Sequence, residues 1–160
     1  MPTHFAAGLN QDTRAQVVDL LNANLVNTIN LTLAVKQAHW NIKGKGFIGV
    51  HEMLDDVADR LRGSADTMAE RAVILGGHAT GTVEIVAEKS TLDAYPADLS
   101  SLEEHILHLK ERFMELGSAV REAADVAEEA GDVDTADLFT EMSRAVDKDA
   151  WFIGANAEAA

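Results

Sequence analysis

Two pairs of potential metal ligands lie on one stretch of the sequence, His51 with Asp55 and Asp66 with Glu70. At about 100° per residue, an α-helix places all four side chains within an arc of roughly 100°. Asp55 and Asp66 are separated by about 16 Å along such a helix, at ~1.5 Å per residue. Because ligand bonds are about 2.0–2.2 Å long, no single ion can be held by both pairs of one chain. Each pair therefore predicts half of a metal site.

The four positions are symmetric about residues 60 and 61. A second copy of this helix, antiparallel about a two-fold axis at that point, would face His51 with Glu70 and Asp55 with Asp66. Two-fold dimers make isologous contacts of this kind. We therefore expect two metal sites, each completed by a second subunit.

Helical spacing alone leaves a structural alternative open, since His and Asp four residues apart on an acidic helix usually form a solvated face. Asp59 and Arg62 share the stripe and offer a spare carboxylate and a competing salt bridge. His39 ends the preceding helical segment, so antiparallel packing would bring it towards His51. Nitrogen and oxygen ligands of this type suit Fe(II), Mn(II) or Zn(II), and the ligand types alone do not choose among them.

Bulk composition is that of one globular domain spanning residues 1–160, with 47% hydrophobic and 25% charged residues. The absence of cysteine excludes disulfides and thiolate metal sites. No apolar run approaches the roughly 18–20 residues of a membrane span, and the N-terminus lacks the pattern of a signal peptide. We therefore expect no membrane association and a cytoplasmic location, with association with the nucleoid as an alternative.

Hydrophobic periodicity predicts an all-α protein of four long helices. Capping boxes at Thr13–Gln16 and Ser101–Glu104, and a capping Asp132, mark three of the starts. The order of long helices, with a long crossover between the second and third, is that of a ferritin-like four-helix bundle. The expected ranges are 10–41 (starting at 10 or 12), 47–75, 100–131 and 132–156, with a short helix at 82–90 in the crossover.

The familiar di-iron site inside such bundles uses Glu-x-x-His units. None of the six histidines of this chain has a Glu or Asp three residues before it. The intra-bundle site is therefore missing, which favours a site between subunits.

Several segments closely resemble the Dps family, the miniferritins or DNA-binding proteins from starved cells. The match extends over nearly the whole chain after about residue 15. The matching motifs include His–Trp, His-x3-Asp and Asp-x3-Glu, and this combination of motifs is highly specific. The matching runs are KQAHWN (36–41), FIGVHEMLD (47–55), DTMAERA (66–72), GG (76–77), YP (95–96), DTAD (134–137), DK (147–148) and WFI (151–153).

This resemblance implies a hollow homo-dodecamer with ferroxidase centres at its two-fold interfaces. His39, His51 and Asp55 of one subunit would bind iron together with Asp66 and Glu70 of the two-fold partner. Fe(II) would be oxidised to Fe(III), with hydrogen peroxide as the preferred oxidant, and stored as ferric mineral. The five ligands are too few for two six-coordinate irons, so we expect one tight site and one weaker site completed by water.

The resemblance also suggests roles for residues outside the ligand set. Trp40 would trap stray oxidising equivalents, with simple core packing as the alternative. Asp134 and Asp137 match positions that line iron-uptake pores on a three-fold axis, and Glu141, one turn further, is a weaker candidate. Acids at a helix start also complement the helix dipole, and both interpretations are compatible. Independently of the resemblance, the apolar stripe of the third long helix excludes His108, so His105 and His108 are expected on a solvated face.

Charge separates two classes of function. The net charge is −14, and residues 1–13 contain no Lys or Arg, including the short non-basic tail at 1–9. Counterion release then offers little driving force for DNA binding, so direct binding is doubtful. We expect a peroxide-consuming ferroxidase and iron store that protects DNA and cell. The alternatives are a starvation-induced protein in which DNA binding is primary, and a bundle that binds Zn(II) or Mn(II) structurally.

Overall fold

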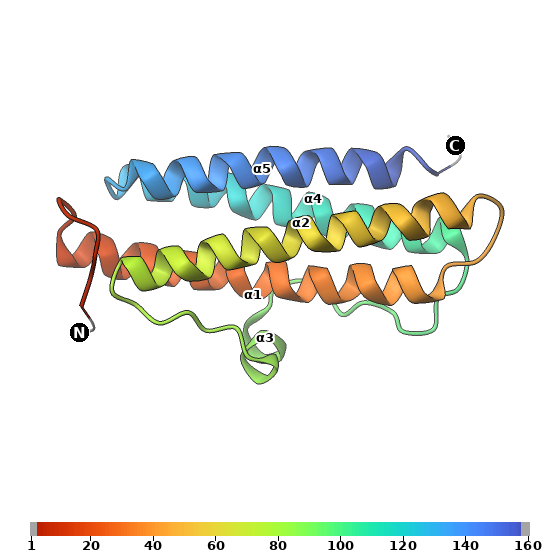
Figure 1. The fold of residues 1–160 in the computed structure, drawn as a ribbon, viewed down its shortest axis with the longest axis horizontal. Coiled ribbons are helices and arrows are strands. Elements are labelled where there is room, and N and C mark those ends of the chain that lie inside the picture. Colours follow the sequence, from red (N-terminus) through yellow and green to blue (C-terminus); the bar gives the residue numbers. More distant parts are fainter. Residues whose placement is uncertain (1–2, 158–160) are drawn as a thin grey trace.

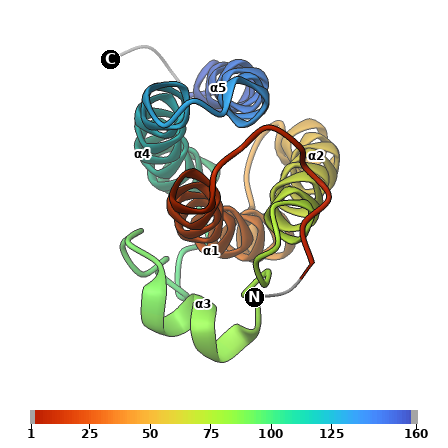
Figure 2. The same ribbon diagram turned by 90° about the vertical axis from the view of Figure 1, so that its left-hand side faces the viewer.

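The computed structural model describes residues 3–157, and these residues form helices joined by loops. Four long helices lie side by side, and the short α3 lies outside the bundle next to α1 (Figures 1 and 2). Within residues 3–157 no strand occurs beyond an isolated bridge between Lys43 and Ser101. The all-α, ferritin-like bundle with a short crossover helix is therefore confirmed. The helices are α1 (Gln11–Asn41), α2 (Phe47–Ile74), α3 (Val83–Lys89), α4 (Leu102–Glu129) and α5 (Val133–Gly154).

Helix starts follow local capping chemistry, with one correction. Ser101 caps α4 by accepting the Glu104 N–H at 3.2 Å, and the Asp132 side chain caps α5. At α1 the cap is Asn10, whose Oδ1 accepts the Thr13 N–H at 2.9 Å. The predicted capping box at Thr13 is therefore wrong. The Thr13 hydroxyl donates instead to the Ala130 carbonyl at 2.9 Å, which ties α1 to the end of α4.

The core is formed where the apolar stripes of the four long helices converge. Helices α1 and α2 pack as one antiparallel hairpin, and α4 and α5 as another. Burial of these stripes is the main favourable term in folding, at about 25 cal/mol per Å² of apolar surface. None of the helices in the described residues is long and apolar enough to cross a membrane. The largest fully buried side chains include Leu21, Leu31, Leu54, Leu61, Phe113, Leu116, Phe139 and Ile153.

The crossover after α3 is fastened to α4 through His105, which corrects a second prediction. His105 was expected on a solvated face, but only 1% of it is exposed. The Tyr95 hydroxyl lies 2.6 Å from its Nδ1, and its Nε2–H donates to the Leu99 carbonyl at 3.0 Å. Arg112 lies over the Tyr95 ring at 5.1 Å. Burial lowers the pKa of His105 and raises the pKa of Tyr95. His108 is half-buried, and its ring lies edge-on to Tyr95.

Candidate metal centre

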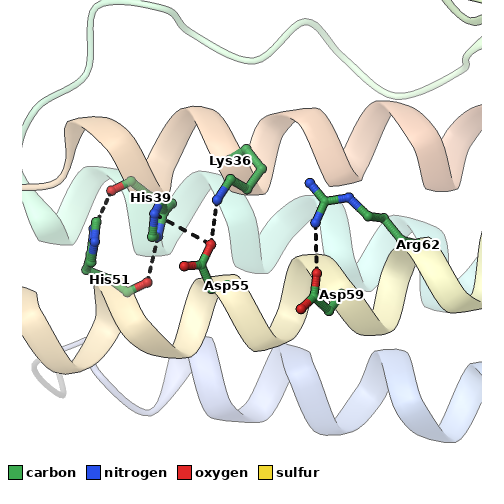
Figure 3. Close-up of polar contacts among 6 residues, drawn as sticks. All are labelled: Lys36, His39, His51, Asp55, Asp59 and Arg62. Atoms are coloured by element: carbon green, nitrogen blue, oxygen red, sulfur yellow. Dashed lines mark hydrogen bonds and ion pairs between the residues drawn. The ribbon is translucent and has the colours of Figure 1, made fainter.

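His39 and His51 meet at one end of the α1–α2 hairpin, as predicted (Figure 3). Their rings stack with centroids 3.7 Å apart and planes inclined by 17°. The Nδ1–H of His39 donates to the His51 carbonyl at 2.7 Å, and the Nδ1–H of His51 donates to the His39 carbonyl at 2.7 Å. Because each Nδ1 is the donor, the Nε2 of a neutral ring keeps its lone pair. The backbone contacts therefore fix both rings and leave each Nε2 available as a ligand atom, as the prediction requires.

The loop between the two helices makes this meeting possible. It is short, and Gly44 and Gly46 adopt φ values of 127° and 81°. Glycine occupies this left-handed region without a Cβ penalty. The Lys43 N–H also donates to the Ser100 carbonyl at 2.9 Å, which anchors the loop to the start of α4. The histidines thus lie on a fixed part of the fold.

Asp55 completes a group of three predicted ligands on this hairpin. It lies one turn after His51 on α2, with Oδ1 at 3.5 Å from the Nε2 of His39. Lys36 of α1 forms an ion pair with the same Oδ1 (Figure 3). The hydrogen bond from Lys36 holds the pKa of Asp55 below its usual range, against a smaller opposing effect of burial. Asp55 is therefore an anion at neutral pH, and its side chain is 54% exposed.

Asp66 and Glu70 lie further along α2, away from these three residues. Both are exposed, and α2 runs without a break through both half-sites. Within residues 3–157 of one chain, no cluster of three or more His, Cys, Asp or Glu residues is arranged to hold a metal ion. In a single chain the two predicted half-sites thus lie apart from each other. Their union across a two-fold interface stays a prediction.

Comparison with known proteins places the chain among established relatives. Residues 18–159 match the Ferritin family, described as the ferritin-like domain. The DNA protection during starvation protein of Agrobacterium fabrum is 43% identical over 159 residues, covering 99% of this chain and 98% of the relative. The chain belongs to the Dps family.

Further relatives agree with this assignment. The DNA protection during starvation protein of Mycolicibacterium smegmatis is 32% identical over 160 residues, covering 100% of this chain and 87% of the relative. A structure of Mycobacterium smegmatis Dps matches with a TM-score of 0.94 at 31% identity, over 100% of this chain and 96% of that one. The structure of an archaeal Dps homologue from Halobacterium salinarum matches with a TM-score of 0.92 at 27% identity, covering 99% of this chain and 89% of that one.

Lys36, which pairs with the predicted ligand Asp55, was not among the residues predicted for this site. Arg62 was considered as the cation competing for the stripe, and Arg62 does pair with Asp59 at 2.8 Å (Figure 3). Lys36 is three residues before His39 and therefore on the same face of α1, which was a usable signal. The cation that contacts the ligand group comes from the other helix of the hairpin.

Trp40 lies beside the half-site but outside the core of this Dps chain. It is 67% exposed, so the alternative of core packing is wrong for the single chain. The Nζ of Lys36 lies 5.8 Å from its ring centroid, within range of a cation–π interaction. Its role as a radical trap stays a prediction.

The expected pore acids lie on the surface of α5. The Asp134 side chain is 86% exposed, and its Oδ2 is 4.0 Å from Arg71 of α2. Asp137 and Glu141 are also exposed. Glu141 lines a groove between α2 and α5. These positions allow contacts with other chains, and the pore itself stays a prediction.

Proposed function

We propose that this Dps-family chain is a ferroxidase and iron-storage miniferritin. It oxidises Fe(II) with hydrogen peroxide at centres shared between subunits of a hollow dodecamer, stores the ferric mineral inside, and so protects DNA and cell in the cytoplasm. The observation that carries the proposal is the pair of histidines whose Nδ1 atoms are engaged by backbone carbonyls. Their Nε2 atoms and the Asp55 carboxylate would supply an incomplete nitrogen–oxygen ligand set of a type that suits Fe(II).

The missing ligands are available on a second copy of α2. Asp66 lies at an apolar groove of about 440 Å³ between α1 and α2, whose lining includes Leu25, Ile29 and Leu33. Leu33 is 52% exposed in the single chain. A two-fold partner would cover this apolar surface. The same contact would bring its Asp66 and Glu70 to the histidine half-site.

The chemistry consumes peroxide without releasing a radical. Two Fe(II) ions each lose one electron to one H₂O₂, whose O–O bond breaks, and two protons complete two water molecules. The histidine Nε2 atoms and the three carboxylates would bind the iron substrate, and the carboxylates would balance its charge. We expect one Fe(II) to bind tightly and a second more weakly with water among its ligands. Trp40 would donate an electron to any stray one-electron oxidant.

Iron reaches these centres, in this proposal, through pores lined by Asp134, Asp137 and, more weakly, Glu141. Three converging copies of such acids would attract cations strongly. The ferric product then collects in the acidic cavity. The exposed placement of all three residues supports this route.

Stopped-flow oxidation of Fe(II) by hydrogen peroxide tests the proposal. We expect rapid oxidation of two Fe(II) per peroxide, and loss of this rate in the double variant Asp66→Ala with Glu70→Ala. The matched control is Glu52→Ala with Asp56→Ala, which removes two exposed carboxylates from the same helix. Unchanged oxidation in the Asp66 and Glu70 variant would refute the shared centre. Anomalous scattering at the iron edge from soaked crystals distinguishes iron from a structural Zn(II) or Mn(II) site.

DNA protection by direct binding is the second candidate, because relatives carry that name. The net charge of −14 and the absence of Lys and Arg from residues 1–13 disfavour it. A gel-shift assay at about 150 mM salt, where screening limits phosphate contacts, should show no retarded DNA. A shift at that salt concentration would instead favour DNA binding as a primary function.

A further inference from the structure

Lys36 occupies the carboxylate that the proposed centre needs for iron. Its ammonium forms an ion pair with Oδ1 of Asp55, and the same oxygen lies 3.5 Å from the His39 Nε2 (Figure 3). The Lys36 side chain is only 16% exposed, so its stem is held between the helices. A cation that binds Oδ1 of Asp55 together with the His39 Nε2 therefore competes directly with this ammonium.

Besides competing for Asp55, the Lys36 ammonium lowers the net negative charge that is available to bound cations. The other cation on this stripe, Arg62, is engaged by Asp59. Among the ion pairs of residues 3–157, Asp66 and Glu70 take part in none. A shared centre with three carboxylates, neutral imidazoles and one ammonium carries two net negative charges, which one divalent ion neutralises. Without the ammonium, a second divalent ion would meet an uncompensated carboxylate.

The Trp40 ring offers the displaced ammonium an alternative contact. The Trp40 ring lies 5.8 Å from the Lys36 Nζ already, and Trp40 is 67% exposed. An indole face is the best aromatic partner for a cation. Lys36 and Trp40 are four residues apart on α1, so a change of side-chain rotamer suffices to strengthen this contact.

We propose that Lys36 is a displaceable counter-ion of the centre, paired with Asp55 in the empty protein and moved onto the face of Trp40 by a bound divalent cation, so that each centre holds one ion tightly. This inference rests on the proposed shared centre and adds to it a residue that sets metal affinity and stoichiometry. Only the Lys36 side chain moves in this proposal, and the histidines stay in place.

Zn(II) titration of the assembled protein tests the inference without redox chemistry. Trp151→Phe leaves Trp40 as the single tryptophan, since the chain contains two. Calorimetry gives affinity and stoichiometry, and Trp40 emission reports the approach of the ammonium. Lys36→Gln removes the charge, and Lys36→Arg is the matched control that keeps it. Zn(II) bound outside the centre is counted with the Asp66→Ala, Glu70→Ala variant.

With Lys36 present, we expect one tightly bound Zn(II) per centre, any second ion binding much more weakly, and an emission change that saturates at the first equivalence. Lys36→Gln should bind the first ion at least about tenfold more tightly, because a like charge is removed from beside it, and should accept a second ion. Its emission should stay unchanged, and Lys36→Arg should bind as the lysine protein does.

Equal affinity and stoichiometry in Lys36→Gln would overturn the role of Lys36 while leaving the centre intact. An emission spectrum that does not respond to Zn(II) in the lysine protein would overturn the move onto Trp40, and this result needs no Lys36 variant to fold. Absence of Zn(II) binding in every protein would refute the shared centre itself.

Discussion

Two inactive variants should restore activity when their chains assemble together. The first variant is His51→Ala with Asp55→Ala, and the second is Asp66→Ala with Glu70→Ala. Each should destroy both centres of its own two-fold dimer, because in the proposed arrangement every centre takes one half-site from each chain. A mixed dimer is different: one centre combines both defects, and the other combines both intact half-sites.

The magnitude follows from the geometry of α2. The helix is continuous from Phe47 to Ile74, so the half-sites of one chain stay about 16 Å apart at ~1.5 Å per residue. Random pairing at equal concentrations makes half of the dimers mixed, and half of the centres in these are intact. The mixture should therefore recover about one quarter of the wild-type rate for a two-fold pair.

The assay is Fe(II) oxidation by peroxide after co-expression or joint refolding of the two variants. A mixture of separately assembled proteins, measured before subunits exchange, is the control and should stay inactive. An inactive co-assembled mixture of confirmed mixed composition would refute the shared centre. Full activity of either variant alone would refute the ligand assignment.

Other predictions concern stability and DNA. Burial lowers the pKa of His105, so the neutral ring's contribution to stability should be complete above the ordinary pKa of 6.5 and should be lost as the pH falls below it. Between pH 7.5 and 5.5, the unfolding temperature should therefore fall less for His105→Gln than for the wild type. Asp149, 2% exposed, accepts three hydrogen bonds from Arg60, at 2.6, 3.0 and 3.3 Å. Asp149→Ala should therefore lower the free energy of unfolding in urea by about 1–3 kcal/mol; no change would show that water replaces the pair fully. In the gel-shift assay, Lys-rich peptide fused before residue 1 should confer DNA binding at about 150 mM salt, and failure would argue against charge as the barrier.

Local chemistry made the helices predictable. The starts at Ser101 and Asp132 and the ends near Gly76 and Gly131 depend on side chains and glycines within a turn of the boundary. The start of α1 was expected at residue 10 or 12, but the capping box was assigned to Thr13 because a plausible partner lies three residues later. Asn10 prevailed because its amide oxygen reaches the Thr13 N–H, and the Thr13 hydroxyl then bonds a distant helix.

The errors at His105 and Lys36 arose from contacts between segments that are distant in the sequence. The apolar stripe of α4 excludes His108, and His105 was placed with it on the solvated face; the crossover instead covers His105, and no local pattern shows where a loop passes. The meeting of His39 with His51 was predictable because a short loop forces the two helices to be antiparallel. The pairing of Lys36 with Asp55 depends on the register between α1 and α2, which spacing within one helix does not fix.

The reciprocal bonds between His39 and His51 determine where entropy is lost when metal binds. Both rings are already held by ring stacking and by two backbone hydrogen bonds, so binding removes little of their freedom. Asp66 and Glu70 are exposed, and in the proposed centre their rotamers would become ordered only when the metal binds. The ordering penalty of capture therefore falls on the carboxylate half of the centre. Affinity should then be tuned more readily by stiffening those two side chains than by any change to the histidines.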